Sequence, residues 1–372
     1  MHESRTLYVA ISAHGYGHIA QTAPVVNELH RRVKGLRVVI ECAAPRDILA
    51  RRFDMAFDHV ARASDFGMVM KSALEVDVAA SHARYVEVHE NLEAEIEAAR
   101  KRMVDNHADV LLANVPYVPL IAARRLDLPA IAMCSLNWAG IYRGLCAGLP
   151  GADAIHAGML QAYASAEAFM AFEPCMDMRE LANLRNIGPV AATGKSIRRE
   201  LDARLGLVGG ARLVTVSMGG IATDLATSRW PRIAGVTWVM PDSAVADRKD
   251  MVTHSSLEAP FVDILCSSDA YVTKPGYGAF AEAACNGVPV IYVPRLDWPE
   301  APYLVRWMQR HGRCSEISYG DLFGERLGEA LNALWRLPSP KRVAPRGIAQ
   351  AADVLEKYLR GARRKAMAGA AT

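Results

Sequence analysis

The sequence lacks several features that would place it in a specialised class of protein. Its 372 residues contain no apolar run close to the roughly 20 residues that a membrane-spanning helix needs. The N-terminal stretch MHESRTLYVAIS has no signal-peptide pattern. The 43 basic and 40 acidic residues nearly balance, so no strong field indicates a nucleic-acid partner. A peripheral membrane contact is not indicated and is left open.

Cysteine clusters and metal-binding carboxylate motifs are also missing. The seven cysteines are scattered singly, with no C-x-x-C pair and no Cys/His group at zinc-ligand spacing. Such a set is typical of reduced, buried thiols in a cytosolic protein, and we expect a cytoplasmic location. The sequence contains no D-x-D motif of the kind that holds a divalent ion, so no metal is expected.

What the chain does contain is a repeated alternation of strand-like apolar runs and helical patterns, which is typical of parallel sheets wound with helices. In the first half the pattern predicts strands at Leu7–Ser12, Arg37–Cys42, Val110–Val115 and Ala130–Cys134. It also predicts one long helix from Ala83 to Val104, with charges at i, i+4 spacing.

A chain of this length favours two domains. The segment NLRNIGPVAATGKS, Asn183–Ser196, has no sustained periodicity and is interpreted as a linker, after which the alternation restarts. The expected domains are 1–187 and 188–345, followed by a C-terminal helix and frayed tail at 346–372. The linker resembles a phosphate-binding P-loop, but five residues separate Gly188 from Gly194 where four are needed. We therefore expect Lys195 to begin a solvated helix.

The first strand leads into a glycine-rich turn, AHGYGHIAQ, in which Gly15, Gly17 and Ala20 spell G-x-G-x-x-A. This pattern is the fingerprint of a dinucleotide-binding turn, and Glu41 stands where the ribose-binding acid would be. A nicotinamide-dependent dehydrogenase is therefore one hypothesis. The turn also holds two histidines, His14 and His18, and His14 is interpreted as a turn residue.

A second candidate site lies in Ser268–Glu300, which predicts a strand, a Gly/Pro turn, a helix closed by a glycine, and another strand. Backbone N–H groups around Lys274 to Gly278 would lie at the start of the helix, and a helix N-terminus favours negative charge. Glu282, about one and a half turns into the helix, is placed to accept both hydroxyls of a ribose. The pattern thus predicts a site for a nucleoside diphosphate.

The stretch TKPGYGAFAEAACNGVPVIYVPR resembles the donor-binding segment of the GT-B glycosyltransferases. This group includes small-molecule UDP-sugar transferases and the N-acetylglucosaminyltransferase of peptidoglycan synthesis. Gly17-His18 matches the G-H pair that follows the first strand in this family, and Ala108–Trp138 resembles its acceptor domain. The first half also resembles the glycosyltransferase-like region of arabinokinase-type proteins. The resemblance implies an α/β GT-B fold, with two Rossmann-like doubly wound parallel-sheet domains facing each other across a cleft.

The resemblance also implies roles for individual residues. His18 would be the general base toward the acceptor hydroxyl, or a group that orients acceptor and donor. The acceptor side would include Gly15, Gly17, Asn114 and Trp138, although Trp138 and Tyr142 fit simple core packing as well. The donor would contact Ser217, Gly219, Gly220, Lys274, Gly276, Tyr277, Gly278, Glu282, Arg295, Asp297 and Glu300.

Two positions depart from the family pattern. Gln21 stands where members often have Pro or Arg, and Asn114 stands where some relatives carry an acidic residue. No carboxylate partner for His18 can therefore be assigned from the sequence.

The function that follows from the resemblance is an inverting, metal-independent glycosyltransferase. It would move a sugar from a nucleotide-sugar, with UDP as the expected nucleotide, to an unknown hydroxyl acceptor, without a resident cofactor. Domain closure about a hinge near Gly188 is expected. The alternatives are a nucleotide-sugar epimerase on the same fold and a non-catalytic protein that binds a nucleotide-sugar.

Overall fold

The computed structural model describes residues 5–72, 74–219, 225, 227–244, 248–338 and 341–369, with side chains up to residue 361. It divides into two compact units. Unit 1 comprises Met1–Lys71, Val76–Val190 and Arg346–Thr372, and unit 2 comprises Ser72–Glu75 and Ala191–Pro345. The chain thus changes unit between Val190 and Ala191, whereas the sequence placed the change after residue 187.

Unit 1 is built on a seven-stranded parallel sheet in the order β3-β2-β1-β4-β5-β6-β7. The strands are β1 (Arg5–Ile11), β2 (Leu36–Glu41), β3 (Asp58–Val60), β4 (Val110–Asn114), β5 (Ala130–Cys134), β6 (Ala168–Phe172) and β7 (Leu184–Ile187). Central strands such as β1 are near-continuous apolar runs because helices cover both faces, and Leu7 to Ile11 are 0% exposed.

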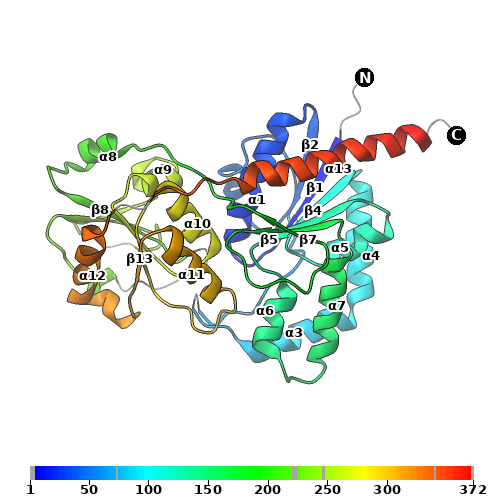
Figure 1. Cartoon of the computed structure of the whole chain (residues 1–372), viewed down its shortest axis with the longest axis horizontal. Coiled ribbons are helices and arrows are strands. Elements are labelled where there is room, and N and C mark those ends of the chain that lie inside the picture. The colour runs from blue at the N-terminus through cyan, green and yellow to red at the C-terminus, as the bar shows by residue number, and fades with distance from the viewer. Residues whose placement is uncertain are drawn as a thin grey trace. The chain divides into compact units, whose positions relative to one another are not determined.

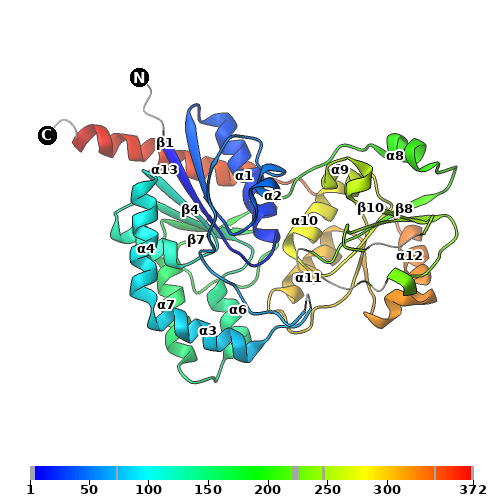
Figure 2. The ribbon, with the colours of Figure 1, turned by 180° about the vertical axis from the view of Figure 1, so that it is seen from behind.

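Two groups of helices cover this sheet. Figure 1 shows α1 (Gly17–Arg32) with α13 (Gly347–Gly369, red) lying alongside it. Figure 1, and the view from behind in Figure 2, also show the other helices of unit 1 grouped at the opposite side of the strands from α13, except the short α2 (Arg46–Ala50). They are α3 (Val78–Glu90), α4 (Leu92–Asp105), α5 (Val118–Arg125), α6 (Trp138–Cys146) and α7 (Ala152–Ala164). The apolar side chains of α13 complete the core. Those that are 0% exposed are Ala351, Ala352, Leu355 and Leu359.

Unit 2 holds a six-stranded parallel sheet in the order β10-β9-β8-β11-β12-β13. Its strands are β8 (Arg212–Val216), β9 (Val236–Met240), β10 (Met251–Thr253), β11 (Ala270–Thr273), β12 (Val290–Tyr292) and β13 (Cys314–Glu316). Its helices are α8 (Arg198–Leu205), α9 (Phe261–Cys266), α10 (Tyr277–Asn286), α11 (Ala301–His311) and α12 (Glu325–Arg336). Short 3-10 turns are η1 (Thr227–Arg229), η2 (Ser255–Leu257) and η3 (Gly320–Phe323). Trp230 and Trp238 pack edge to face inside its core.

The topology defines one special place in each sheet. In unit 1 the strand order reverses between β1 and β4, and in unit 2 it reverses between β8 and β11. The helices after these paired strands leave toward opposite faces of the sheet, so a crevice opens outside the carboxyl ends of the strands. Ligands of open α/β sheets bind at such switch points. The carboxyl ends of β1 and β4 in unit 1, and of β8 and β11 in unit 2, are therefore the candidate sites.

Two elements differ from the sequence-based expectation. The single helix predicted from Ala83 to Val104 is wrong, because the structure has α3 and α4, separated at Asn91. The Asn91 side chain donates to the backbone oxygen of Glu87 at 2.9 Å, and such local side-chain bonds compete with continuation of a helix.

The other difference concerns the predicted linker. Its first part, Leu184–Ile187, is strand β7, which pairs in parallel with β6 at the edge of the sheet. Its second part does not form a phosphate loop. The backbone N–H of Gly194 donates to Asn286 Oδ1 and that of Lys195 to Asp263 Oδ1, each at 2.8 Å. Lys195 precedes α8, which begins at Arg198, so the expectation that it begins a helix is wrong.

Candidate functional site

The candidate site of unit 1 lies at the switch point between β1 and β4. His18 is the second residue of α1, which begins directly after the glycine turn, and Asn114 is the last residue of β4. Ile11 and Asn114 are paired in register, so the two strand ends meet at one edge of the sheet. The structure thus brings His18 together with Asn114, which the sequence assigned to the acceptor side.

A chain of hydrogen bonds sets the tautomer of neutral His18. Asn114 Nδ2 donates to Gln21 Oε1 at 3.1 Å, because Gln21 Nε2 is used in a bond to Ser135 Oγ at 3.2 Å. Asn114 Oδ1 is therefore the atom that faces His18 Nδ1, at 2.8 Å, and it can only accept. His18 consequently carries its proton on Nδ1, and Nε2 presents a lone pair.

Burial keeps this imidazole neutral. His18 is 5% exposed, and its burial lowers the pKa to about 4, with the hydrogen bond to Asn114 opposing the shift. The thiol of Cys134, at the end of β5, donates to Gln21 Oε1 at 3.3 Å and closes the polar cluster. Gln21, the departure from the family pattern, therefore orients the amide of Asn114. No regularity of the sequence pointed to this role.

An aspartate that the sequence did not single out lies at the same edge. The Asp65 carboxylate accepts from Ser12 Oγ at 2.8 Å, from the Ala13 N–H at 3.1 Å, and from Trp138 Nε1 at 2.7 Å. The Trp138 ring packs against His18, with ring centroids 5.7 Å apart, and against His14 at 5.3 Å. Trp138 is 0% exposed, so it is a buried wall of this edge and not an open platform.

The glycines of the turn have different surroundings. Gly15 has a φ of 76°, in the region that favours glycine, while an added Cβ at Gly15 or Gly17 would meet nothing within 4 Å. Gly17 is exposed, and no close neighbour explains a glycine there. Both residues leave open space beside the first turn of α1.

The nicotinamide hypothesis does not fit the structure. Glu41, the residue expected to bind a ribose, is 1% exposed. Its carboxylate takes two hydrogen bonds from Arg102, at 3.0 and 3.1 Å, and others from Ser64 Oγ at 2.5 Å and from the Tyr8 hydroxyl. This carboxylate is thus engaged inside the unit and is not available to a cofactor.

The candidate site of unit 2 lies at the switch point between β8 and β11. Ser217 and Gly219 follow β8, and Lys274 follows β11. Ser217 Oγ accepts from the Gly219 N–H at 3.4 Å, and Gly219 has a φ of 84°. A Cβ at Gly219 would lie 3.5 Å from Lys274 Cε, so the lysine chain runs over this turn. Gly220 lies outside the described residues.

Two buried cations are the most distinctive feature of this edge. Lys274 and Arg295 are each 8% exposed. Burial lowers the pKa of Lys274 to about 7, with a further contribution from the charge of Arg295, while Asp297 opposes the shift. Burial also lowers the pKa of Arg295, to about 10, so it stays charged at neutral pH. Two basic side chains buried together favour an anion as their ligand, because an anion would stabilise the charged form of each.

The loop after β12 holds the arginine in place. Arg295 Cζ lies 4.0 Å from the centroid of the Trp298 ring, and Trp298 Nε1 donates to Glu300 Oε2 at 3.2 Å. Glu300 is 3% exposed, whereas Asp297 is exposed. A predicted sugar-contacting carboxylate, Glu300, therefore also orients the indole beneath the guanidinium.

Helix α10 begins three residues after Lys274. Gly276 is its N-cap, with extended backbone, and no side chain caps the first turn, in which Tyr277 and Gly278 lie. Tyr277 is 4% exposed and Gly278 is partly buried. Glu282 lies in the same helix and is 4% exposed, so it is not the surface carboxylate of the alternative interpretation.

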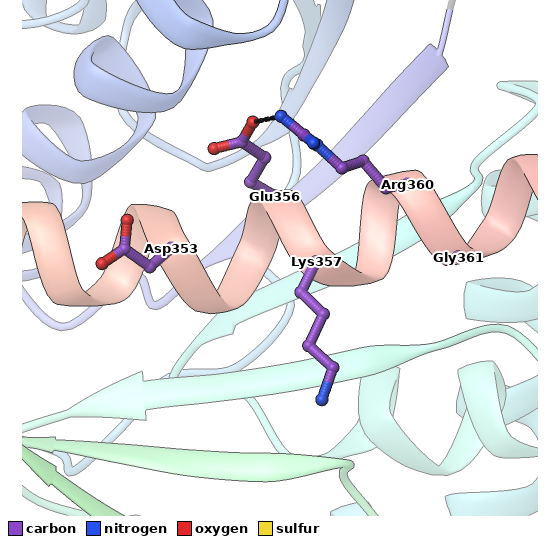
Figure 3. Close-up of a pocket in the computed structure, with 5 residues that line it drawn as sticks. All are labelled: Asp353, Glu356, Lys357, Arg360 and Gly361. Atoms are coloured by element: carbon purple, nitrogen blue, oxygen red, sulfur yellow. Dashed lines mark hydrogen bonds and ion pairs between the residues drawn. The ribbon is translucent and has the colours of Figure 1, made fainter.

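Outside these edges, a surface hollow runs along α13 (Figure 3). Its lining residues are Asp353, Glu356, Lys357, Arg360 and Gly361. Arg360 pairs with Glu356, and Asp353 accepts from Arg32 Nη1 at 2.5 Å. Its lining residues include none of the predicted site residues. Among the described residues no group of three or more His, Cys, Asp or Glu could hold a metal ion, and no helix is long and apolar enough to cross a membrane.

Solved structures share this architecture along nearly the whole chain. CalG4, the calicheamicin glycosyltransferase, matches with a TM-score of 0.63 and 20% identity, over 96% of this chain and 98% of its own. The glycosyltransferase of kitacinnamycin matches with a TM-score of 0.61 and 17% identity, over 97% and 96%. UGT2 of Phytolacca americana, complexed with UDP-2fluoro-glucose and pterostilbene, matches with a TM-score of 0.59 and 13% identity, over 98% of this chain and 95% of its own. The chain has the GT-B fold.

The GT-B fold predicted from the sequence is thereby confirmed, with its two parallel sheets. No family model matches the chain. L-arabinokinase of Arabidopsis thaliana is 24% identical over 325 residues. That match covers 84% of this chain but only 30% of the arabinokinase, so it concerns less than a third of that protein.

The pairing of His18 with Asn114 makes a direct prediction. Replacing Asn114 by aspartate places a negative charge 2.8 Å from His18 Nδ1, which favours the imidazolium. We expect the pKa of His18 to rise from about 4 by about 1 to 3 units, followed by NMR titration of the imidazole. The control is Asn27→Asp, which adds the same charge on α1, the helix of His18. The Asn27 side chain faces the backbone oxygen of Arg52 and not His18. An unchanged pKa in Asn114→Asp would contradict the assigned contact.

Proposed function

We propose that the chain is a glycosyltransferase that moves a sugar from a nucleotide-sugar, with UDP as the expected nucleotide, to a hydroxyl acceptor. The observation that carries this proposal is the pair of switch-point sites on a GT-B fold. One holds a neutral histidine with a defined lone pair, and the other holds two buried cations. UGT2 is a GT-B protein complexed with a UDP-sugar analogue and pterostilbene, which supports a nucleotide-sugar donor and a small acceptor.

The proposed chemistry is a single displacement with inversion. His18 Nε2 takes the proton of the acceptor hydroxyl while the oxygen of that hydroxyl forms a bond to the anomeric carbon of the donor sugar. The bond from that carbon to the diphosphate breaks, and the nucleoside diphosphate leaves with the electron pair. His18 suits the base role because Asn114 holds the proton on Nδ1 and burial keeps Nε2 unprotonated.

The leaving group needs stabilisation of its negative charge. Lys274 and Arg295 supply positive charge in a buried setting, where electrostatic interactions are stronger than in water. The first turn of α10 adds N–H dipoles oriented toward the same strand ends. We propose that these groups replace a metal ion, and that Glu282 binds the ribose while Asp297 and Glu300 contact the sugar.

The proposal is tested first by donor binding. A thermal-shift screen compares UDP-, dTDP-, GDP- and ADP-linked sugars and NAD, with Glu282→Ala as the site variant. A ligand at about 100 times its Kd adds about 2.7 kcal/mol to the unfolding free energy, which is a shift of a few degrees. The UDP-sugars are expected to stabilise the wild type and to lose this effect in Glu282→Ala. No shift with any nucleotide-sugar at millimolar concentration would refute the donor site.

Turnover separates the alternatives that share this fold. The protein is incubated with the stabilising donor, with and without a panel of hydroxyl acceptors, and products are followed by mass spectrometry and NMR. A glycosylated acceptor with inverted anomeric configuration supports transfer. A new sugar isomer from the donor alone indicates an epimerase, and binding without any product indicates a non-catalytic protein.

Donor binding is expected to depend on pH through Lys274. Because the pKa of this lysine is about 7 without ligand, a growing fraction becomes neutral as the pH rises, and the diphosphate then loses one attractive charge. We expect the affinity for UDP-glucose to fall by up to about 10-fold per pH unit between pH 7 and 9. Calorimetric titration measures it. Lys274→Arg keeps a charge over this range, so persistence of the full pH dependence in that variant would contradict the role of Lys274.

A further inference from the structure

Asp65 connects segments that are far apart in the sequence. Its Oδ1 accepts from Ser12 Oγ and the Ala13 N–H, in the loop between β1 and α1. Its Oδ2 accepts from Trp138 Nε1, at the first residue of α6. One carboxylate therefore fixes both the turn that leads to His18 and the indole against which His18 packs.

The indole is the link between Asp65 and the histidines. Trp138 is 0% exposed, and its ring packs against those of both His14 and His18, with centroids 5.3 and 5.7 Å away. Asp65 holds the only polar atom of that ring. Loss of this bond would leave the buried Nε1–H without this acceptor, so the indole would shift and the packing of His18 would change with it.

The segment that carries Asp65 is itself held on both sides. Ser64 Oγ donates to the buried Glu41, and the Met68 N–H donates to His14 Nδ1 at 3.4 Å. Gly67 has a φ of 66°, and a Cβ there would lie 2.6 Å from His14 Cβ. The backbone of this segment is thus closely packed against the histidine turn, so Asp65 has a defined position.

We propose that Asp65, as an ionised carboxylate, is a positioning residue for His18, acting through Trp138 and the turn of Ser12 and Ala13. The catalytic consequence rests on the proposed transferase function. The structural consequence does not, because the position and environment of the Trp138 indole can be observed without turnover.

The surroundings of Asp65 make its charge sensitive to pH. Burial raises the pKa of this carboxyl to about 6, the hydrogen bonds from Ser12, Ala13 and Trp138 oppose the shift, and the charge of Glu41 adds to it. The charge of Asp65 also acts on the phenols of Tyr85, Tyr117 and Tyr163 and on the thiol of Cys42, which are all neutral near pH 7. A protonated carboxyl presents an O–H to one of its donors, so one of the bonds is lost.

The first test observes Trp138 in the full chain. The indole N–H resonances are recorded by NMR with 15N-labelled tryptophan between pH 5 and 8, and Trp138→Phe assigns the signal. We expect the wild-type Trp138 signal to titrate near pH 6, and the titration to disappear in Asp65→Asn, in which the His18 imidazole signals also shift. The wild-type titration needs no Asp65 variant to fold. A Trp138 signal that does not change with pH would overturn the proposal.

The second test compares activity with stability. If transfer is observed, we expect Asp65→Asn to lower kcat by about 10- to 100-fold with little change in the KM for the donor. The wild-type kcat should fall below pH 6 as Asp65 is protonated, and this fall should be absent in Asp65→Asn. Asp54→Asn, at an exposed position, is the matched control. Absence of transfer with every acceptor would contradict the proposed function alone, and the NMR result would still decide the role of Asp65.

The direction of the stability change separates positioning from a merely structural role. The folded pKa of Asp65, about 6, lies above the usual value for aspartate, so its ionisation disfavours folding. The unfolding free energy of the wild type relative to Asp65→Asn should therefore rise as the pH falls from 6 to 4, while relative activity falls. If the relative unfolding free energy and the relative activity both fell as the pH falls from 6 to 4, the charge would only support the fold, and the proposal would be overturned.

Discussion

Replacing His18 by alanine is expected to lower the transfer rate by about 100- to 10,000-fold, the range that a general base contributes. The variant loses the lone pair on Nε2 that Asn114 and the buried environment maintain. Donor binding should be retained, because the proposed donor contacts are residues of unit 2. Steady-state kinetics of sugar transfer and calorimetric titration with UDP-glucose measure the two effects separately.

The control for this experiment is His30→Ala, on the same helix but in its last turn. It removes an imidazole from α1 and should leave kcat within about twofold. A His18→Ala variant as active as the wild type would exclude the base role. Equal loss of rate in both variants would indicate that a disturbed helix, and not missing chemistry, is responsible.

The pH dependence of stability offers a second check on His18. Its folded pKa of about 4 lies below the ordinary value of 6.5, so the unfolded chain takes up a proton first as the pH falls. The contribution of neutral His18 to the unfolding free energy is present above pH 6.5 and is lost between about 6.5 and 4. Urea denaturation of wild type and His18→Ala over this range should show the difference.

Replacing Glu41 by alanine is expected to cost unit 1 about 3 to 5 kcal/mol of unfolding free energy. Glu41 is 1% exposed and Arg102 only 17% in its side chain, so the variant leaves a guanidinium largely buried without its two bonds to the carboxylate. The hydroxyls of Tyr8 and Ser64 also lose their acceptor. The urea midpoint of the unit 1 transition measures this loss.

A surface ion pair provides the matched comparison. Arg62 and Glu95 lie 3.2 Å apart, with side chains 48% and 44% exposed. Glu95→Ala should change the unfolding free energy by less than about 1 kcal/mol, since water screens exposed pairs. If Glu41→Ala cost no more than Glu95→Ala, the buried network would not stabilise the unit as proposed.

The central strands could be predicted from the sequence because their physical signal is strong. Strands buried on both faces are continuous apolar runs, and β4 and β5 stand almost where those runs predict them. Strand β7 gave no such signal. It lies at the sheet edge, and Arg185 and Asn186 within it are exposed, so its four residues lack an apolar pattern.

The candidate site could be predicted only in part, for a related reason. His18 and Lys274 were found because both accompany a glycine-containing turn after a strand: Lys274 directly follows β11, and His18 lies in the first turn of the helix that follows β1. Asp65 lies in a segment without helical or strand periodicity, and its partners come from positions 53 and 73 residues away. Such contacts depend on how the segment packs against the folded sheet, which no local pattern records.

The helix α13 has a consequence for how the protein is made. It follows unit 2 in the chain but contributes Leu355 and Leu359 to the core of unit 1 and pairs with α1 through Arg32 and Asp353. During synthesis the first sheet therefore emerges long before the helix that covers one side of it. Until the ribosome has translated all of unit 2, the apolar face that α13 will cover stays exposed to solvent and to chaperones.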